Sequence, residues 1–320
     1  MKKHFAVCIF LFVVSQLTFA DIPLSENTEL VFASKKQAGK LLAQKDDYTQ
    51  RLSQFDLTAK LQRKSPATVK QFLSFARKQG MNWEKEEKQR LGEIFQSLQA
   101  PLAPYVDLLP EKVYLVKTTG RVESGALYTR GNNIYIPARN MAMGDDQLTT
   151  IMLHELFHII TRNNPELRDR LYAAIGFVKT SELVLPEPLR SRKISNPDVP
   201  VLSHLIKVTI EGKERWVTPI IYSGTDYDRA IKRVFFQYLK LAVLVYDWDG
   251  SGEPSAAMEN GKPLLVPLGQ VAGLFEQIGR NAQTVFHPEE VLADNFALLV
   301  RGHRVASPEV LDKMRKAFAR

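Results

Sequence analysis

The pattern of apolar and polar positions predicts a helical region near the start of the chain. From about residue 27 to residue 100 the composition is rich in Lys, Gln, Glu, Leu and Ala. Apolar residues in this stretch, such as Phe72 and Phe75, recur at helical spacing. We therefore expect residues 21–104 to form a helical N-terminal region.

Short strands are expected after this region, because brief apolar runs alternate with turn residues. The runs that predict strands are residues 112–116, 126–128, 134–136, 206–210 and 216–221. The turn at residues 130–133 joins the second and third of them into a hairpin, and the turn at residues 211–213 joins the last two.

Helical periodicity returns between and after the hairpins. The segments that predict helices are residues 145–162, 165–177, 226–245, 268–279 and 288–300. A Pro-rich loop without periodicity covers residues 185–200, and a Gly-rich loop covers residues 249–253. The pattern therefore predicts a helix-rich α+β fold with two small antiparallel hairpins.

The first twenty residues are typical of a secretory signal peptide. Lys2 and Lys3 give a charged start, residues 5–14 are apolar, and Ala20 is a small residue at the expected cleavage position. The alternative is a membrane anchor, but the apolar run is shorter than the ~20 residues that a spanning helix needs. We expect residues 1–20 to be removed and the mature chain to be periplasmic or secreted.

Composition then excludes several classes of function. The only cysteine, Cys8, lies in the predicted signal peptide, so the mature chain is expected to have no disulfide and no thiolate metal site. Loss of Lys2 and Lys3 lowers the formal charge from +8 to +6, and the basic residues are not interleaved with aromatic ones. We therefore expect no nucleic-acid partner. Later apolar runs are too short or too interrupted for a transmembrane segment.

Candidate chemistry is concentrated in one predicted helix. His154, Glu155 and His158 form the pattern HExxH, in which two histidines at i and i+4 share a helix face and can bind one zinc ion. The glutamate between them is placed beside the open coordination position. The surrounding residues are apolar, so an imidazole pair without a ligand would be costly to bury there. The alternative is a histidine pair that makes ordinary hydrogen bonds.

A third zinc ligand is expected from the predicted helix at residues 288–300. Glu290 and Asp294 lie at i and i+4, so one carboxylate can bind the metal while the other holds a ligand histidine by its second ring nitrogen. His287 is the rival ligand, because imidazole also suits zinc. It precedes a proline at a predicted helix boundary and lacks the spacing of the histidine pair, so we favour Glu290.

These two motifs resemble the gluzincins, which are HExxH metallopeptidases whose third ligand is the glutamate of a downstream Glu-x-x-x-Asp helix. The resemblance rests on residues 154–158 and 290–294, with the hairpin before the first motif as further support. It implies a zincin-like metalloprotease core over residues 105–320, with a long insertion between the two metal-binding helices.

The resemblance also implies a role for each site residue. Zn²⁺ would be bound by His154, His158 and Glu290, and Asp294 would orient His154. In the family the residue before the glutamate ligand can orient the second histidine. This chain has Glu289 there, where thermolysin-like members have Asn, so this contact stays open.

The expected reaction is hydrolysis of amide bonds in an extended polypeptide substrate. Glu155 would act as general base towards a water that the zinc ion activates. The family commonly uses a second electrophile, for which Tyr222 ranks first; the other candidates are Tyr227, His204 and His303. In zincins an edge strand before the metal helix pairs with the substrate, and the hairpin at residues 126–136 has the matching place. The alternative is an ordinary structural hairpin.

Other interpretations stay open at this point. Residues 247–252 match the opening of a calcium loop, but Met258 occupies the position of the bidentate glutamate, so we interpret them as a polar turn. The chain could instead be an inactive zinc-site protein that serves as a binding or scaffolding module, or a hydrolase of cell-wall peptide. Retention of Glu155 favours an active enzyme. The sequence leaves the oligomeric state undetermined.

Overall fold

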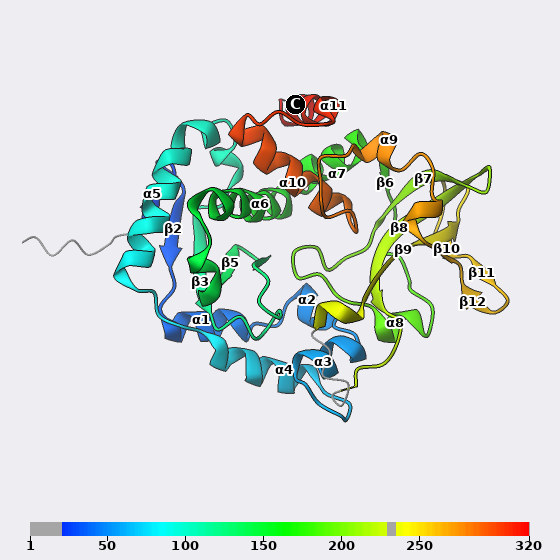
Figure 1. The fold of residues 1–320 in the computed structure, drawn as a ribbon, viewed down its shortest axis with the longest axis horizontal. Helices are drawn as coiled ribbons and strands as arrows, with labels where there is room; N and C mark the ends of the chain where they lie inside the picture. The colour runs from blue at the N-terminus through cyan, green and yellow to red at the C-terminus, as the bar shows by residue number, and fades with distance from the viewer. Residues whose placement is uncertain (1–20, 229–234, 320) are drawn as a thin grey trace, which may run out of the picture.

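The computed structural model describes residues 21–228 and 235–319, in which helices surround one β-sheet and a second, antiparallel sheet lies at the other end of the molecule (Figure 1). The predicted signal peptide and Cys8 lie outside these residues. The helices are α1 Lys35–Leu42, α2 Asp47–Gln50, α3 Gln54–Lys60, α4 Val69–Ala76, α5 Lys85–Leu102, α6 Asp145–Asn163, α7 Pro165–Ala174, α8 Leu189–Arg192, α9 Phe275–Ile278, α10 Pro288–Arg301 and α11 Pro308–Phe318. The α+β class predicted from the sequence is confirmed.

The first sheet has five strands in the order β1-β2-β3-β5-β4. Its strands are β1 Ile22–Pro23, β2 Glu29–Phe32, β3 Lys112–Thr118, β4 Tyr128–Arg130 and β5 Asn133–Pro137. Strands β2, β3 and β5 are parallel, whereas the edge strand β4 runs antiparallel to β5. The hairpin predicted at residues 126–136 is therefore correct, and it forms one side of a larger mixed sheet.

Both faces of this sheet are covered, as expected for parallel strands. On one face Leu115 and Ile134 belong to the main core, which includes the apolar sides of α5, α6 and α10. On the other face Val116 and Tyr135 pack with α1 and α4. The alternation of side chains along β3 and β5 thus fixes α6 on one side of the sheet.

The second sheet has six antiparallel strands in the order β10-β9-β8-β7-β6, with β13 also paired to β9. Its strands are β6 Phe177–Lys179, β7 His204–Ile210, β8 Lys213–Ser223, β9 Leu239–Asp247, β10 Ser255–Ala256 and β13 Leu265–Val266, and a separate small pair is formed by β11 Met258–Glu259 and β12 Lys262–Pro263. The hairpin predicted at residues 206–221 corresponds to β7 and β8. Both predicted antiparallel hairpins are therefore present, but each belongs to a larger sheet that the sequence did not predict.

The prediction of a helix at residues 226–245 was wrong. Residues 229–234 lie outside the described residues, Phe235–Tyr238 form one 3-10 turn, and Leu239–Asp247 form β9. The apolar run in β9 is continuous because both faces of this strand are buried: Val243 and Val245 belong to the main core, and Leu244 and Tyr246 belong to another apolar cluster. Periodicity alone does not distinguish such a strand from a buried helix.

The segment at residues 268–279 is less helical than predicted. It contains a 3-10 turn at Leu268–Gln270 and the single turn of α9. The helix predicted at residues 165–177 ends at Ala174, and β6 begins at Phe177. The helix predicted at residues 288–300 is correct and is α10.

Residues 21–104 contribute to the same framework as the rest of the chain. Strands β1 and β2 extend the first sheet, and Leu91 and Phe95 of α5 are fully buried in the main core. In the part of the chain that the structure describes, no helix combines the length and the apolar character needed to cross a bilayer.

A buried ion pair helps to hold α3 against the loop between β3 and β4. Lys60 of α3 pairs with Glu123, and the hydroxyl of Tyr48 donates a hydrogen bond of 2.6 Å to the same carboxylate. The side chains of Lys60 and Glu123 are only 1% and 7% exposed. Removal of one partner would leave the other charge buried alone, which is costly.

We therefore expect Lys60→Met to lower the free energy of unfolding by about 3–5 kcal/mol. The measurement is urea unfolding followed by circular dichroism. Lys64→Met, at an exposed position, serves as the matched control and should change stability little. A Lys60→Met protein as stable as the Lys64→Met protein would contradict the importance of this ion pair.

Candidate metal centre

Helix α6 presents His154 and His158 side by side. Their ring centroids are 4.7 Å apart, as the i, i+4 spacing requires. The helix is held by its apolar neighbours, since Met152, Leu156 and Phe157 are fully buried in the main core. His158 is buried, whereas the His154 side chain keeps 17% of its exposure. Solvent therefore reaches the pair from the side of His154, and His158 lies on the inner side.

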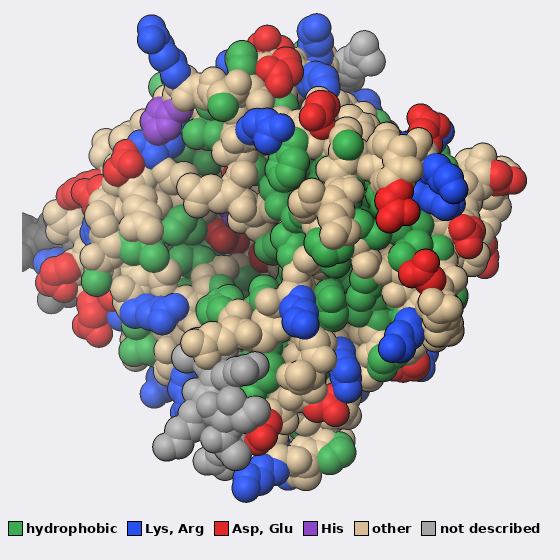
Figure 2. Space-filling model, turned by 45° about the vertical axis from the view of Figure 1, so that its right-hand side comes forward, with side chains coloured by type: hydrophobic (Ala, Val, Ile, Leu, Met, Phe, Trp, Pro, Cys, Tyr) green, Lys and Arg blue, Asp and Glu red, His purple; other side chains and the backbone are tan. Residues whose placement is uncertain are grey.

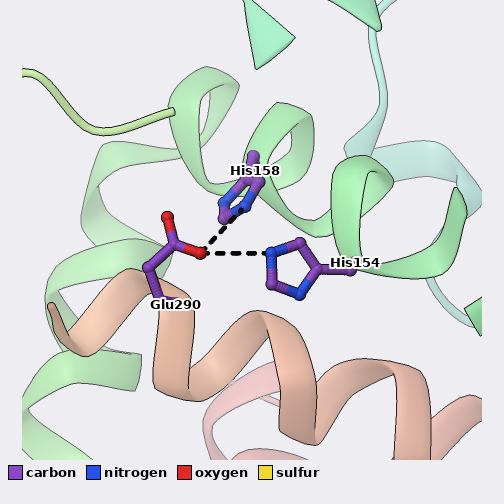
Figure 3. Close-up of side chains that lie close together, drawn as sticks. All are labelled: His154, His158 and Glu290. Atoms are coloured by element: carbon purple, nitrogen blue, oxygen red, sulfur yellow. Dashed lines mark hydrogen bonds and ion pairs between the residues drawn. The ribbon is translucent and has the colours of Figure 1, made fainter. Parts of the chain in front are cut away.

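Helix α10 packs against α6 and brings Glu290 to both imidazoles (Figure 3). The Oε2 atom of Glu290 lies 3.2 Å from Nε2 of His154 and 3.8 Å from Nε2 of His158. Ligand atoms at zinc distances of about 2.0–2.1 Å in a tetrahedral site are separated by about 3.3–3.4 Å. The three ligand atoms all lie within 4.8 Å of one another, close enough for one shared metal ion to draw them together.

The second nitrogen of His154 is held by Asp294. Nδ1 of His154 lies 2.9 Å from Oδ1 of Asp294, whose other oxygen accepts hydrogen bonds from the backbone N–H groups of Gln283 and Thr284. A carboxylate in this position fixes the proton on Nδ1 and leaves Nε2 as the donor for a metal. The structure thus brings together the three predicted zinc ligands, which are His154, His158 and Glu290, and Asp294, which was predicted to orient His154.

Glu289 holds the second histidine, a contact that the sequence left open. Its Oε1 lies 2.9 Å from Nδ1 of His158 and accepts a hydrogen bond from the Thr161 hydroxyl. Its Oε2 accepts a hydrogen bond from the hydroxyl of Tyr172 in α7. These partners satisfy a carboxylate that is only 2% exposed. Thr161 and Tyr172 carried no motif, so sequence reasoning did not find them.

Two buried polar atoms at the centre have no hydrogen-bond partner among the described residues. They are Nε2 of His158 and Oε2 of Glu155. Buried polar atoms are normally satisfied, and leaving one unpaired costs about 1–3 kcal/mol. A metal ion on Nε2 and a water beside Glu155 would satisfy both, so the donor set fits a zinc ion.

The charges of the cluster influence one another strongly. Burial opposes charge on both rings, but the charge of Glu290 helps to raise the pKa of His158 to about 9, and a hydrogen bond to Asp294 helps to raise that of His154 well above its usual range. Burial would raise the pKa of Glu290, yet the His158 charge and a His154 hydrogen bond lower it to about 2. The carboxylates therefore favour a positive charge here, which a divalent cation could supply in place of a proton.

Glu155 shows the opposite shift. Burial, with the nearby charge of Asp198 as the next cause, raises its pKa to about 8. A cation held by His154, His158 and Glu290 would favour the ionised form of Glu155. The carboxylate can then accept a proton from a water at the site.

His287, the rival third ligand, has a different role. It is the N-cap of α10, where its Nδ1 accepts a hydrogen bond from the backbone N–H of Glu289 at 3.1 Å. Its ring contacts Tyr172 edge-on, and burial lowers its pKa to about 3. The donor cluster of His154, His158 and Glu290 does not include it.

The candidates for a second electrophile lie in varied surroundings. Tyr222 is partly buried against an apolar cluster of the second sheet, and Tyr227 packs against Tyr238. His204 is buried in β7 against the Tyr172 ring, and burial lowers its pKa to about 4. His303 is exposed just beyond the C-terminal end of α10, about 20 Å along the helix from Glu290. The described contacts of Tyr222 do not reach the metal centre.

Asp247 is the last residue of β9, and residues 248–252 form the bend that follows it. Oδ1 of Asp249 accepts hydrogen bonds from the backbone N–H and the hydroxyl of Ser251. Among the described residues, the groups of His, Asp and Glu that could hold an ion include neither Asp247 nor Asp249.

A Pro-rich loop contributes two further side chains that the sequence did not predict. Asn196 donates a hydrogen bond of 2.5 Å to Oε1 of Glu290. A carboxylate oxygen of Asp198 lies within 4.8 Å of ligand atoms of both Glu155 and His158. The loop has no periodicity and lies about forty residues beyond the HExxH motif of α6. No sequence signal therefore connected it with the site.

No protein-family model, no curated protein and no solved structure matches this chain. The function of the site therefore has to be argued from its own side chains.

The contact between Asp294 and His154 gives a direct test of the metal centre. Loss of a carboxylate that orients a ligand histidine typically weakens metal binding by about 10–100-fold. We expect Asp294→Ala to weaken zinc binding by this factor in competition with a chromophoric chelator. Asp294→Asn, which keeps an acceptor for Nδ1, should show a smaller loss.

Asp312→Ala is the matched control, because Asp312 is an exposed aspartate on α11. Equal zinc affinity in Asp294→Ala and Asp312→Ala would show that Asp294 does not support a metal ligand.

Proposed function

We propose that this chain is an exported zinc-dependent peptidase. The convergence of His154, His158 and Glu290 on one point, beside the unpartnered Oε2 of Glu155, supports this proposal most directly. Two imidazoles and one carboxylate are a ligand set of catalytic zinc sites, which keep a position free for water or substrate. The signal peptide expected at residues 1–20 supports export.

A zinc ion bound there would supply Lewis acidity, which polarises a carbonyl group and lowers the pKa of water. The protein side chains do the remaining work. Asp294 and Glu289 hold the two imidazoles with Nε2 directed at the metal position. Glu155 accepts the proton of the attacking water and delivers it to the leaving amine.

The order of the elements supports a zincin-like core. The metal-binding helix α6 follows the β4–β5 hairpin, and β4 is an edge strand of the first sheet. An extended peptide could add to such an edge through main-chain hydrogen bonds. This arrangement favours unfolded or extended polypeptide as the substrate class.

The role of Glu155 is tested by Glu155→Gln, a change that keeps the size of the side chain and removes its basicity. General-base catalysis typically contributes about 10²–10⁴-fold to a rate. We expect hydrolysis of an unfolded polypeptide such as reduced casein to fall by that factor, while zinc content stays at one ion per chain. The rate is followed by the release of amino groups.

Glu166→Gln, on the exposed side of α7, is the matched control and should keep full activity and zinc content. Stoichiometric zinc with equally negligible hydrolysis by wild type and Glu155→Gln would rule out the peptidase and leave a zinc-site binding protein.

A further inference from the structure

The loop between α8 and β7 passes through the middle of the molecule (Figure 1), and hydrogen bonds tether it to several neighbouring elements. Residues 194–203 contain no helix or strand. The backbone N–H of Ile194 bonds to the carbonyl of Ile221 in β8, and the N–H of Ser195 bonds to Asp56 of α3. The amide of Asn196 then donates to the proposed ligand Glu290. We call residues 194–200 the strap.

Asp198 binds the strap to the edge strand of the first sheet. Its Oδ1 accepts hydrogen bonds from the backbone N–H of Thr129 at 2.6 Å and from the Thr129 hydroxyl at 3.0 Å. Arg162 of α6 donates to the backbone carbonyl of Asp198 at 2.7 Å. The strap is therefore held by β4, α6 and α10 together.

This contact uses the main-chain donor that an added strand would need. Thr129 lies in the middle of β4, and its N–H faces away from β5 towards the loop. An extended substrate that pairs with β4 would compete with Asp198 for this donor. Substrate binding and the observed position of the strap are thus mutually exclusive at Thr129.

Asp198 also lies close to two side chains of the metal centre. Its carboxylate lies within 4.8 Å of ligand atoms of Glu155 and His158, and the latter is a ligand in the proposed metal set. Both of these buried side chains have an atom without a hydrogen-bond partner in the described part of the chain. A zinc ion with three protein ligands keeps an open position, whereas a fourth protein ligand closes the site.

We propose that the strap is an autoinhibitory element, in which Asp198 blocks the edge donor of Thr129 and completes the metal coordination as a fourth ligand. This inference rests on the proposed peptidase function and adds a resting state to it. Substrate gains access only when residues 194–200 move out of the site.

The surroundings of the strap allow such a movement. A cavity of about 440 Å³ lies beside it, lined by Pro197 to Val201 and by polar side chains that include Arg162 and His204. Pro197 and Pro200 have no backbone N–H, so they contribute no main-chain donor to hold the strap in place. On the face shown in Figure 2 the surface is hollowed, with acidic side chains at the bottom of the hollow.

The test uses full-length zinc-loaded protein and acetohydroxamic acid, a small ligand that chelates zinc. Its apparent affinity is reduced by the fraction of molecules in which the site is closed. We expect calorimetry to show binding at least about 10-fold tighter for Asp198→Ala than for wild type, at one zinc per chain in both. Asp198→Asn, which can still accept from Thr129 but is a poorer ligand, should give an intermediate gain.

Asp226→Ala is the matched control, since Asp226 is 85% exposed in an ion pair with Arg192 outside the site. It should bind the hydroxamate like wild type. Equal affinity in wild type and Asp198→Ala, both carrying one zinc, would overturn the strap proposal while leaving the peptidase proposal intact. Absence of zinc from wild type would overturn both.

Hydrogen exchange of the wild-type protein gives a second measurement that needs no variant. Saturation with acetohydroxamic acid should increase deuterium uptake in peptides that cover residues 194–200 and Thr129, because the ligand displaces Asp198. Unchanged uptake in these peptides, with the hydroxamate bound, would also overturn the proposal.

Discussion

One constraint governs the structure: several ionisable side chains are buried between α6 and α10, and each buried charge needs a partner. Glu155, His158, Glu289 and Glu290 are all no more than 5% exposed. Charges in such surroundings are tolerated only when they are paired and hydrogen-bonded. Three of the four ring nitrogens of His154 and His158 lie within hydrogen-bond distance of a carboxylate oxygen. The fourth, Nε2 of His158, has no hydrogen-bond partner among the described residues. A divalent cation bound there would remove this remaining imbalance.

The rest of the fold holds the two helices at the separation that this cluster requires. Alternate residues of β3 and β5 pack against the core that contains α6, while Phe157 of α6 and Phe296 of α10 are in ring contact at 5.4 Å. Tyr172 extends the support from α7 by bonding to Glu289. The site is thus positioned by rigid helices, whereas the strap that crosses it belongs to a loop. Such a division allows a fixed ligand set with variable access.

The sequence predicted those parts of the site whose residues lie close together in the chain. HExxH and Glu290 with Asp294 are i, i+4 pairs, so helix geometry alone brought their side chains to one face. Asn196, Asp198 and Tyr172 lie far from these motifs in the chain, and their approach depends on packing that no local pattern records. The β9 segment was predicted to be helical because a continuous apolar run has no period to distinguish the two structures. The separate sheets were missed because strand order depends on long-range pairing.

Everything proposed for this site requires that His154, His158 and Glu290 bind one zinc ion. The most direct measurement is the zinc X-ray absorption spectrum of the purified full-length protein. We expect stoichiometric zinc with a first shell of only nitrogen and oxygen at about 2.0–2.1 Å, and with scattering from two imidazole rings. Protein without zinc, or a spectrum that requires a number of imidazoles other than two, would contradict it.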